Sequence, residues 1–207
     1  MIGVIDYGAG NLGSVMNALK RLGLQARLAA GPEELGASSP FGKIIFPGDG
    51  HFVSAMASLE KSGYGQAIKE WIKADKPFLG ICIGLQLLLD SSEEAPPADG
   101  KQIRSLGLIS GEVKKFPGRR IPQIGWNSTR ARASSKLFKG IPDNTFFYYI
   151  HSYYADPKDK SVIASETEYY LPYCSAVEQG SLAAVQFHPE KSGSWGLALL
   201  ENWAGGA

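Results

Sequence analysis

The chain has 207 residues, of which 20% are charged, and its net charge at pH 7 is +1. That length suits one α/β domain over residues 1–207, and the near-zero charge argues against recruitment of nucleic acid or an anionic membrane by an overall field. Two cysteines and three scattered histidines argue against a disulfide framework, a metal or another bound cofactor, and the lack of a signal-like N-terminus or a bilayer-length apolar run predicts a cytoplasmic protein.

The first half of the chain alternates short β-rich runs with helical patterns, as a parallel sheet covered on both faces requires. We expect strands over residues 2–6, 25–29, 43–46 and 77–81, and helices over residues 12–22, 54–59, 65–73 and 84–90. Residues 91–100 contain paired prolines and charges, which predict an exposed loop.

In the second half the β-rich runs lie close together, which favours antiparallel pairing. They cover residues 107–114, 144–154, 161–167, 173–178 and 181–186, and residues 197–203 would form a closing helix. Gln179 and Gly180 suit a tight hairpin turn. These patterns together predict a three-layer α/β fold, with a mainly parallel central sheet and an antiparallel extension.

A glycine pattern follows the first expected strand and has the local form of a dinucleotide-binding turn. It reads Gly8-Ala-Gly10-Asn-Leu-Gly13. Such a site also needs an acidic residue at the end of the second strand, and this strand ends on Ala30 and Gly31. We therefore interpret the glycines as a tight strand-to-helix turn, with a dinucleotide-binding module as the alternative.

Cys82 lies between a buried strand and an apolar helix, in the run Gly80-Ile-Cys82-Ile-Gly84-Leu-Gln86. The flanking glycines permit a turn that lifts the cysteine side chain out of the sheet, as in a nucleophile elbow. The same turn places the sulfur at a helix N-terminus, where the helix dipole favours a thiolate. The alternative is a buried structural cysteine, the commoner fate of a free thiol.

The best candidate for a base is His188, in the run Phe187-His188-Pro189-Glu190. Positions i and i+2 of an extended segment point to the same side, so Glu190 can orient the imidazole of His188. Cys82, His188 and Glu190 would then form a catalytic triad. For His51 and His151 we expect surface or packing roles, since neither has a carboxylate at a useful spacing.

Attack of a thiolate on an acyl group also requires donors for the oxyanion. One would be the backbone amide of Ile83, the residue after the nucleophile. A second would come from the loop Pro47-Gly48-Asp49-Gly50, at the carboxyl end of a strand, where glycines let the backbone approach a ligand. An ordinary turn is the alternative for this loop.

These two motifs resemble those of the class I, triad-type glutamine amidotransferases, which share a flavodoxin-like fold. The resemblance implies that the thiolate attacks the side-chain amide of glutamine, forms a γ-glutamyl thioester and releases ammonia. It also implies that Gln86 helps to hold the substrate glutamine.

Within that family the chain is most similar to glutaminase subunits of imidazole glycerol phosphate synthase, an enzyme of histidine biosynthesis. The similar segments are 6–11, 47–52, 125–127, 149–153 and 188–192, together with Leu85, where related subunits of other synthases usually carry histidine. Two positions depart from the pattern. Asp49 replaces a small apolar residue, so we expect its carboxylate to face away from the oxyanion or to alter how the loop switches, and Gln123 replaces a histidine.

This resemblance implies a (β/α)8-barrel cyclase as heterodimer partner, which uses the ammonia to make imidazole glycerol phosphate and AICAR. Candidate contacts with the partner are Asn11, Trp126, Asn127, Tyr149 and Lys191, although Tyr149 also suits a core strand. Alternatives are the glutaminase subunit of another synthase, for anthranilate, aminodeoxychorismate or pyridoxal phosphate, and a stand-alone thiol hydrolase of γ-glutamyl bonds.

Overall fold

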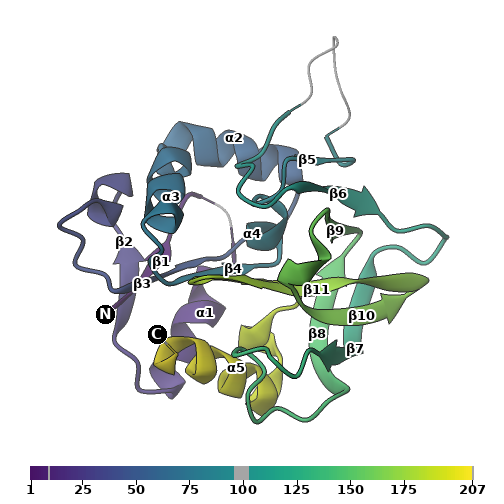
Figure 1. Ribbon diagram of the computed structural model, residues 1–207. Coiled ribbons are helices and arrows are strands. Elements are labelled where there is room, and N and C mark those ends of the chain that lie inside the picture. Colours follow the sequence, from purple (N-terminus) through teal and green to yellow (C-terminus); the bar gives the residue numbers. More distant parts are fainter. Residues whose placement is uncertain (9, 96–102, 207) are drawn as a thin grey trace.

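A computed structural model describes residues 1–8, 10–95 and 103–206 of the chain. A continuous sheet runs through the molecule in the strand order β2-β1-β3-β4-β12-β11-β10-β7-β8 (Figure 1). Its strands are β1 (Ile2–Ile5), β2 (Ala26–Ala29), β3 (Lys43–Phe46), β4 (Phe78–Ile81), β7 (Gln123–Ala131), β8 (Thr145–His151), β10 (Ile163–Tyr169), β11 (Leu171–Gln179) and β12 (Leu182–Val185). Three further strands, β5 (Ser91–Ser92), β6 (Gly111–Lys115) and β9 (Tyr153–Pro157), attach through β11.

The sheet is parallel on one side and antiparallel on the other. β2, β1, β3, β4 and β12 pair in parallel, whereas β12, β11, β10, β7 and β8 pair antiparallel. The hairpin between β11 and β12 pairs Gln179 with Leu182, and Gly180 takes the positive φ of 60° that its turn requires. The predicted fold class is therefore confirmed.

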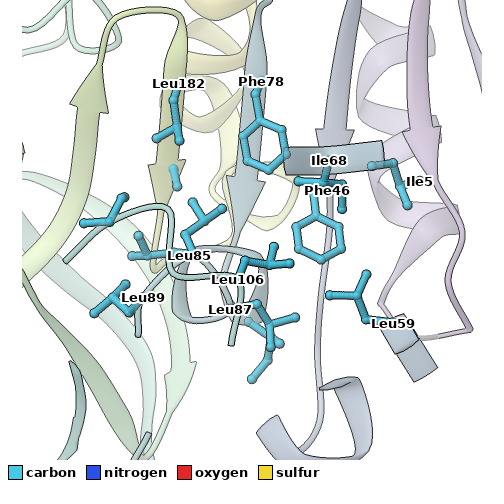
Figure 2. Close-up of a cluster of buried hydrophobic side chains, with 14 of the residues drawn as sticks. Ile5, Phe46, Leu59, Ile68, Phe78, Leu85, Leu87, Leu89, Leu106 and Leu182 are labelled. Carbon is cyan, nitrogen blue, oxygen red and sulfur yellow. The ribbon is translucent and has the colours of Figure 1, made fainter. Parts of the chain in front are cut away.

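Helices cover both faces of the parallel half, which makes three layers (Figure 1). They are α1 (Leu12–Arg21), α2 (Phe52–Ser62), α3 (Tyr64–Lys73), α4 (Ile83–Gln86) and α5 (Gly193–Gly205), with short 3-10 turns η1 (Pro32–Leu35), η2 (Lys160–Val162) and η3 (Pro189–Lys191). On one face, α2 and α3 bury Leu59 and Ile68 against Phe46 and Phe78 of the sheet (Figure 2). On the other, α1 and α5 pack on a second buried cluster. None of the helices in the described ranges is long and apolar enough to cross a membrane.

The helix predicted over residues 84–90 is shorter in the structure and ends at Gln86. The carbonyl groups of Leu87, Leu88 and Leu89 accept hydrogen bonds from the backbone of residues 106–109, at 2.8 to 3.0 Å. The amides also leave the α-helical pattern. Those of Leu88 and Leu89 donate to the carbonyl oxygens three residues back, at 3.1 and 3.2 Å, and that of Asp90 donates to Gly111 instead of Gln86. A sequence pattern of apolar residues does not reveal this competition.

The antiparallel half differs most from the prediction. The run 144–154 is two strands, β8 and β9, and β6 begins only at Gly111. β7 was not predicted, because Gly125 and Asn127 are residue types depleted in strands. In the predicted loop, β5 pairs with β6, and Ser92 and Ala95 are buried while Glu93 is exposed, so the described part is only partly exposed. Residues 96–100 lie outside the described ranges.

Candidate active site

Cys82 lies at the junction of β4 and α4 in a strained backbone conformation, with φ 56° and ψ −108°. The chain closes this turn only because glycines flank it. A Cβ on Gly84 would lie 2.1 Å from the carbonyl oxygen of Phe46, and one on Gly80 would lie 2.8 Å from the carbonyl oxygen of Gly84. The elbow predicted from the glycine spacing is therefore the geometry observed, and strain of this kind is typical of functional sites.

His188 is brought to this elbow by the pairing of β12 with β4, which sets Val185 beside Ile81. Its Nδ1 lies 2.8 Å from Oε1 of Glu190, and both side chains are almost fully buried. Nε2 makes no hydrogen bond of ordinary geometry to any described residue. Burial lowers the pKa of this imidazole, but the nearby Cys82 and then Glu190 outweigh burial and hold the pKa above its usual value.

Cys82 and His188 both line a cavity of about 350 Å³ beside the elbow. Two further groups lie on its wall: the carboxylate of Glu94, which the sequence analysis did not single out, and the imidazole of His51, which is 82% exposed and for which a surface or packing role was expected. Glu94 lies 3.0 Å from Nδ1 of His51 and accepts a 3.0 Å hydrogen bond from the amide of Phe52 at the start of α2. The sequence around Glu93 and Glu94 does not indicate a functional role, because only the fold brings Glu94 to the cavity.

The loop predicted to supply an oxyanion donor lies next to the elbow. Asp49 and Gly50 line the cavity together with Ile83, whose amide is at the first position of α4 and is left unpaired by the helix. Gly48 is buried beneath them, and a Cβ there would lie 2.8 Å from both Ile83 Cβ and the hydroxyl of Tyr7. The Asp49 carboxylate accepts a 3.0 Å hydrogen bond from the amide of Gly10.

The glycine-rich turn after β1 is thus hydrogen-bonded to the 47–50 loop, through Gly10 and Asp49. Gly8 and Gly10 have φ of 86° and 107°, which favour glycine, and residue 9 lies outside the described ranges. Glu34, one of the two acidic residues that follow β2, forms an ion pair with Arg27 at 2.7 Å and accepts from the amide of Ala30. It is therefore engaged locally and not available to a ribose.

Gln86 also lines the cavity and is almost fully buried. Its side-chain amide donates to the carbonyl oxygen of Tyr153 at 3.0 Å and to Oε1 of Gln186 at 3.1 Å. Its Oε1 has no partner among the described residues. An acceptor is thus left open at a buried position, where an unsatisfied polar atom is costly.

The five predicted contacts with a partner differ in accessibility: two are exposed, two bond to other residues of the chain, and one is buried. Trp126 is 55% exposed and Lys191 lies exposed at the cavity, so both are accessible. Asn11 caps α1 by accepting from the amide of Ser14, and Asn127 donates to the carbonyl oxygen of Glu168.

Tyr149 is fully buried, and its prediction as an interface residue is wrong. β8 alternates its side chains, so Tyr149 faces the core, where its hydroxyl lies 2.6 Å from Thr129 Oγ1 and 2.7 Å from Thr167 Oγ1.

Gln123 and His151 face each other across β7 and β8. Oε1 of Gln123 accepts from the hydroxyl of Tyr173, and Nε2 of His151 lies 3.3 Å from the same hydroxyl. Burial lowers the pKa of His151 to about 4, against an opposing hydrogen bond to the carbonyl oxygen of Tyr153. Gln123 therefore belongs to a buried polar cluster behind the cavity.

A buried thiol at a strained elbow, with a carboxylate-bound histidine beside it, is the arrangement expected of an α/β enzyme with a cysteine nucleophile. Comparisons with known proteins agree. The family model for "Glutamine amidotransferase class-I" matches residues 3–204. The structure of PurLQS from Thermotoga maritima superposes with a TM-score of 0.75 at 15% identity, covering 99% of this chain and 97% of that one. At that identity the superposition shows the fold alone.

Two relatives are much closer in sequence. The imidazole glycerol phosphate synthase subunit HisH of Dehalococcoides mccartyi strain CBDB1 is 47% identical over 204 residues, which are 98% of this chain and 96% of the relative. The protein of the same name from Desulfitobacterium hafniense strain DCB-2 is 44% identical and covers 98% and 93%. The chain therefore belongs to the class-I glutamine amidotransferase family, among its HisH members.

Proposed function

We propose that this chain hydrolyses glutamine at Cys82 and delivers the ammonia to a synthase partner in the cytoplasm, as the glutaminase subunit of an imidazole glycerol phosphate synthase. The observation that carries the proposal is the elbow cysteine sharing one cavity with the Glu190-bound His188. The names of the HisH relatives support the choice of synthase.

The geometry supports a two-step reaction through a thioester. The Cys82 sulfur attacks the side-chain carbonyl carbon of glutamine, while the Ile83 amide and the 47–50 loop face the oxygen that gains negative charge. His188 holds the thiol proton and gives it to the amide nitrogen, so that the C–N bond breaks and ammonia leaves. Water then attacks the thioester, His188 accepts its proton, and the C–S bond breaks to release glutamate and restore the thiol.

Polar groups on the cavity wall suit the rest of the substrate. Glutamine carries an α-ammonium group, and Glu94 offers a carboxylate whose side chain is only 15% exposed. The open Oε1 of Gln86 can accept from an N–H of the substrate. A free amino acid with a side-chain amide therefore fits the donors and acceptors of this site.

The partner would cover an apolar surface beside the cavity, which we call the rim patch. It consists of the exposed side chains of β7 and β8, namely Ile124, Trp126, Phe146 and Ile150. Ile150 also lines the cavity, so the patch reaches the mouth of the site. Exposed apolar surface of this kind marks an interface, and we propose a (β/α)8-barrel cyclase as the protein that binds there.

The first test replaces the nucleophile. Cys82→Ala should abolish ammonia release from glutamine and leave complex formation intact, because Cys82 is 4% exposed and does not belong to the rim patch. The matched control is Cys174→Ala, the other free cysteine, which lies buried on β11 away from the cavity and should keep glutaminase activity. Glutamine hydrolysis by Cys82→Ala would refute the assignment of the nucleophile.

The second test measures ammonia release with and without the candidate partner. Stimulation by the cyclase supports a subunit that works within the synthase. Full activity of the isolated chain, unchanged by the cyclase, would instead favour a stand-alone γ-glutamyl hydrolase. Stimulation by a different synthase at equal concentration would identify another pathway.

A further inference from the structure

Gln186 is a fully buried polar side chain that the mechanism above does not use. It follows β12 directly, two residues before His188, and the parallel pairing of β12 with β4 carries it to the elbow. Its Nε2 lies 3.7 Å from Sγ of Cys82, within hydrogen-bond range of a sulfur acceptor. Gln186 is not among the residues that line the cavity, so it reaches the sulfur from inside the protein.

The orientation of the Gln186 amide is fixed by its neighbours. The carbonyl oxygen of Tyr153 can only accept, so the Gln86 group that contacts it at 3.0 Å must be the NH2 group. That NH2 group also contacts Gln186 at 3.1 Å and must meet an acceptor there, which is Oε1 of Gln186. The remaining Gln186 group, which faces Cys82, is therefore the N–H donor.

We propose that Gln186 acts in glutamine hydrolysis as a buried hydrogen-bond donor to the Cys82 sulfur, and that Gln86 positions it. A donor on this side stabilises negative charge on sulfur. The sulfur carries that charge when it attacks, and it regains an electron pair when the C–S bond of the thioester breaks. Because the donor approaches from within the protein, the opposite side of the sulfur stays open to substrate and to His188.

This inference rests on the proposed function, but one of its tests does not. Iodoacetamide reacts with a thiolate by forming an S–C bond and expelling iodide, whether or not the chain hydrolyses glutamine. The rate at which Cys82 is alkylated, located by mass spectrometry, therefore reports on the sulfur alone. Glutamine turnover by the complex is measured in parallel.

Two variants distinguish the loss of the hydrogen-bond donor from the loss of side-chain volume. Gln186→Met keeps an unbranched side chain of similar length without the donor, and Gln186→Glu keeps the shape but offers the sulfur a carboxylate oxygen. We expect alkylation at pH 7 to fall about tenfold in Gln186→Met and further in Gln186→Glu. The difference from the parent should shrink towards pH 10, and kcat should fall about 10- to 100-fold with little change in KM.

The control is Ser165→Ala, which removes a buried 2.8 Å hydrogen bond between Ser165 and Ser175 on β10 and β11 and leaves the hydrogen bond to Cys82 in place. In this control, Cys82 should be alkylated at the parental rate. A folded Gln186→Met protein that is alkylated and turns over like the parent would overturn the inference, whatever happens to Gln186→Glu. A parent that is alkylated but does not hydrolyse glutamine, even with the cyclase, would overturn the proposed function and leave the alkylation comparison standing.

Discussion

Of the three histidines that line the cavity, His188 and His151 have surroundings that drive their protonation in opposite directions. His188 is bound to the Glu190 carboxylate and lies near Cys82, and these groups raise its pKa despite burial. His151 is bound only to a backbone carbonyl and a tyrosine hydroxyl, so burial dominates and lowers its pKa to about 4. A proton at this site is therefore held by His188, next to the sulfur, and not by His151.

The low pKa of His151 predicts acid sensitivity of the fold. Between pH 6.5 and about 4 the unfolded chain protonates this histidine while the folded chain keeps it neutral, so the free energy of unfolding falls as the pH falls. The loss attributable to His151 should be about 3 kcal/mol across that window. Urea unfolding at several pH values would measure it, with His151→Gln expected to flatten the dependence.

The control for that experiment is His51→Gln, which changes a histidine whose side chain is 82% exposed. This variant should follow the parental pH profile. An identical acid dependence in His151→Gln and the parent would show that His151 titrates alike in the folded and unfolded chains.

The 47–50 loop and the glycine-rich turn form one unit at the carboxyl end of the sheet, joined by the bond from Gly10 to Asp49. Burial is the largest cause that raises the pKa of Tyr7, and the electrostatic effects of Asp49 and Cys82 raise it further. The charge of Asp49 therefore acts on groups within the site. Asp49 therefore has two separable effects. Its oxygen tethers the loop, and in the proposed reaction its negative charge would oppose an oxyanion forming in the cavity.

Asp49→Asn separates these effects, because an amide oxygen can still accept from Gly10 while the charge is lost. We expect kcat for glutamine hydrolysis to rise about threefold to tenfold, with an advantage over the parent that shrinks as added salt screens the charge. Asp49→Val removes charge and tether together, and it should cost about 1 kcal/mol of stability for the lost hydrogen bond. A lower kcat in Asp49→Asn would show that the carboxylate assists the reaction.

Local features of the site were predictable from the sequence, and features set by strand pairing were not. The elbow at Cys82 and the reach of Glu190 to His188 follow from glycine positions and from i, i+2 geometry. The contact of Gln186 with Cys82 spans 104 positions and depends on β12 pairing with β4. Likewise, the burial of Tyr149 follows from which face of β8 lies against the core, and the sequence alone does not reveal this face.

Across the whole molecule, the two halves of the sheet supply different parts of the proposed function. The parallel half presents the elbow and the 47–50 loop at the carboxyl ends of its strands, where ligands bind in α/β folds. The antiparallel half ends in β7 and β8 (Figure 1). These strands carry the rim patch, which reaches the cavity through Ile150. A partner seated on the patch would thus meet ammonia where it forms, before it is protonated in bulk water.

Trp126 is the largest exposed side chain of the rim patch and packs edge-on against Tyr148, with ring centroids 6.1 Å apart. Aromatic residues of this kind dominate binding energies, so Trp126→Lys should weaken the complex with the cyclase at least 30-fold in Kd, as about 2 kcal/mol implies. The matched control is Leu28→Lys, which places the same charge on β2, at the opposite end of the strand order. Calorimetric titration would compare the two, with ammonia release by each isolated chain expected at the parental rate. Equal affinities for the two variants would show that the cyclase binds elsewhere on the molecule.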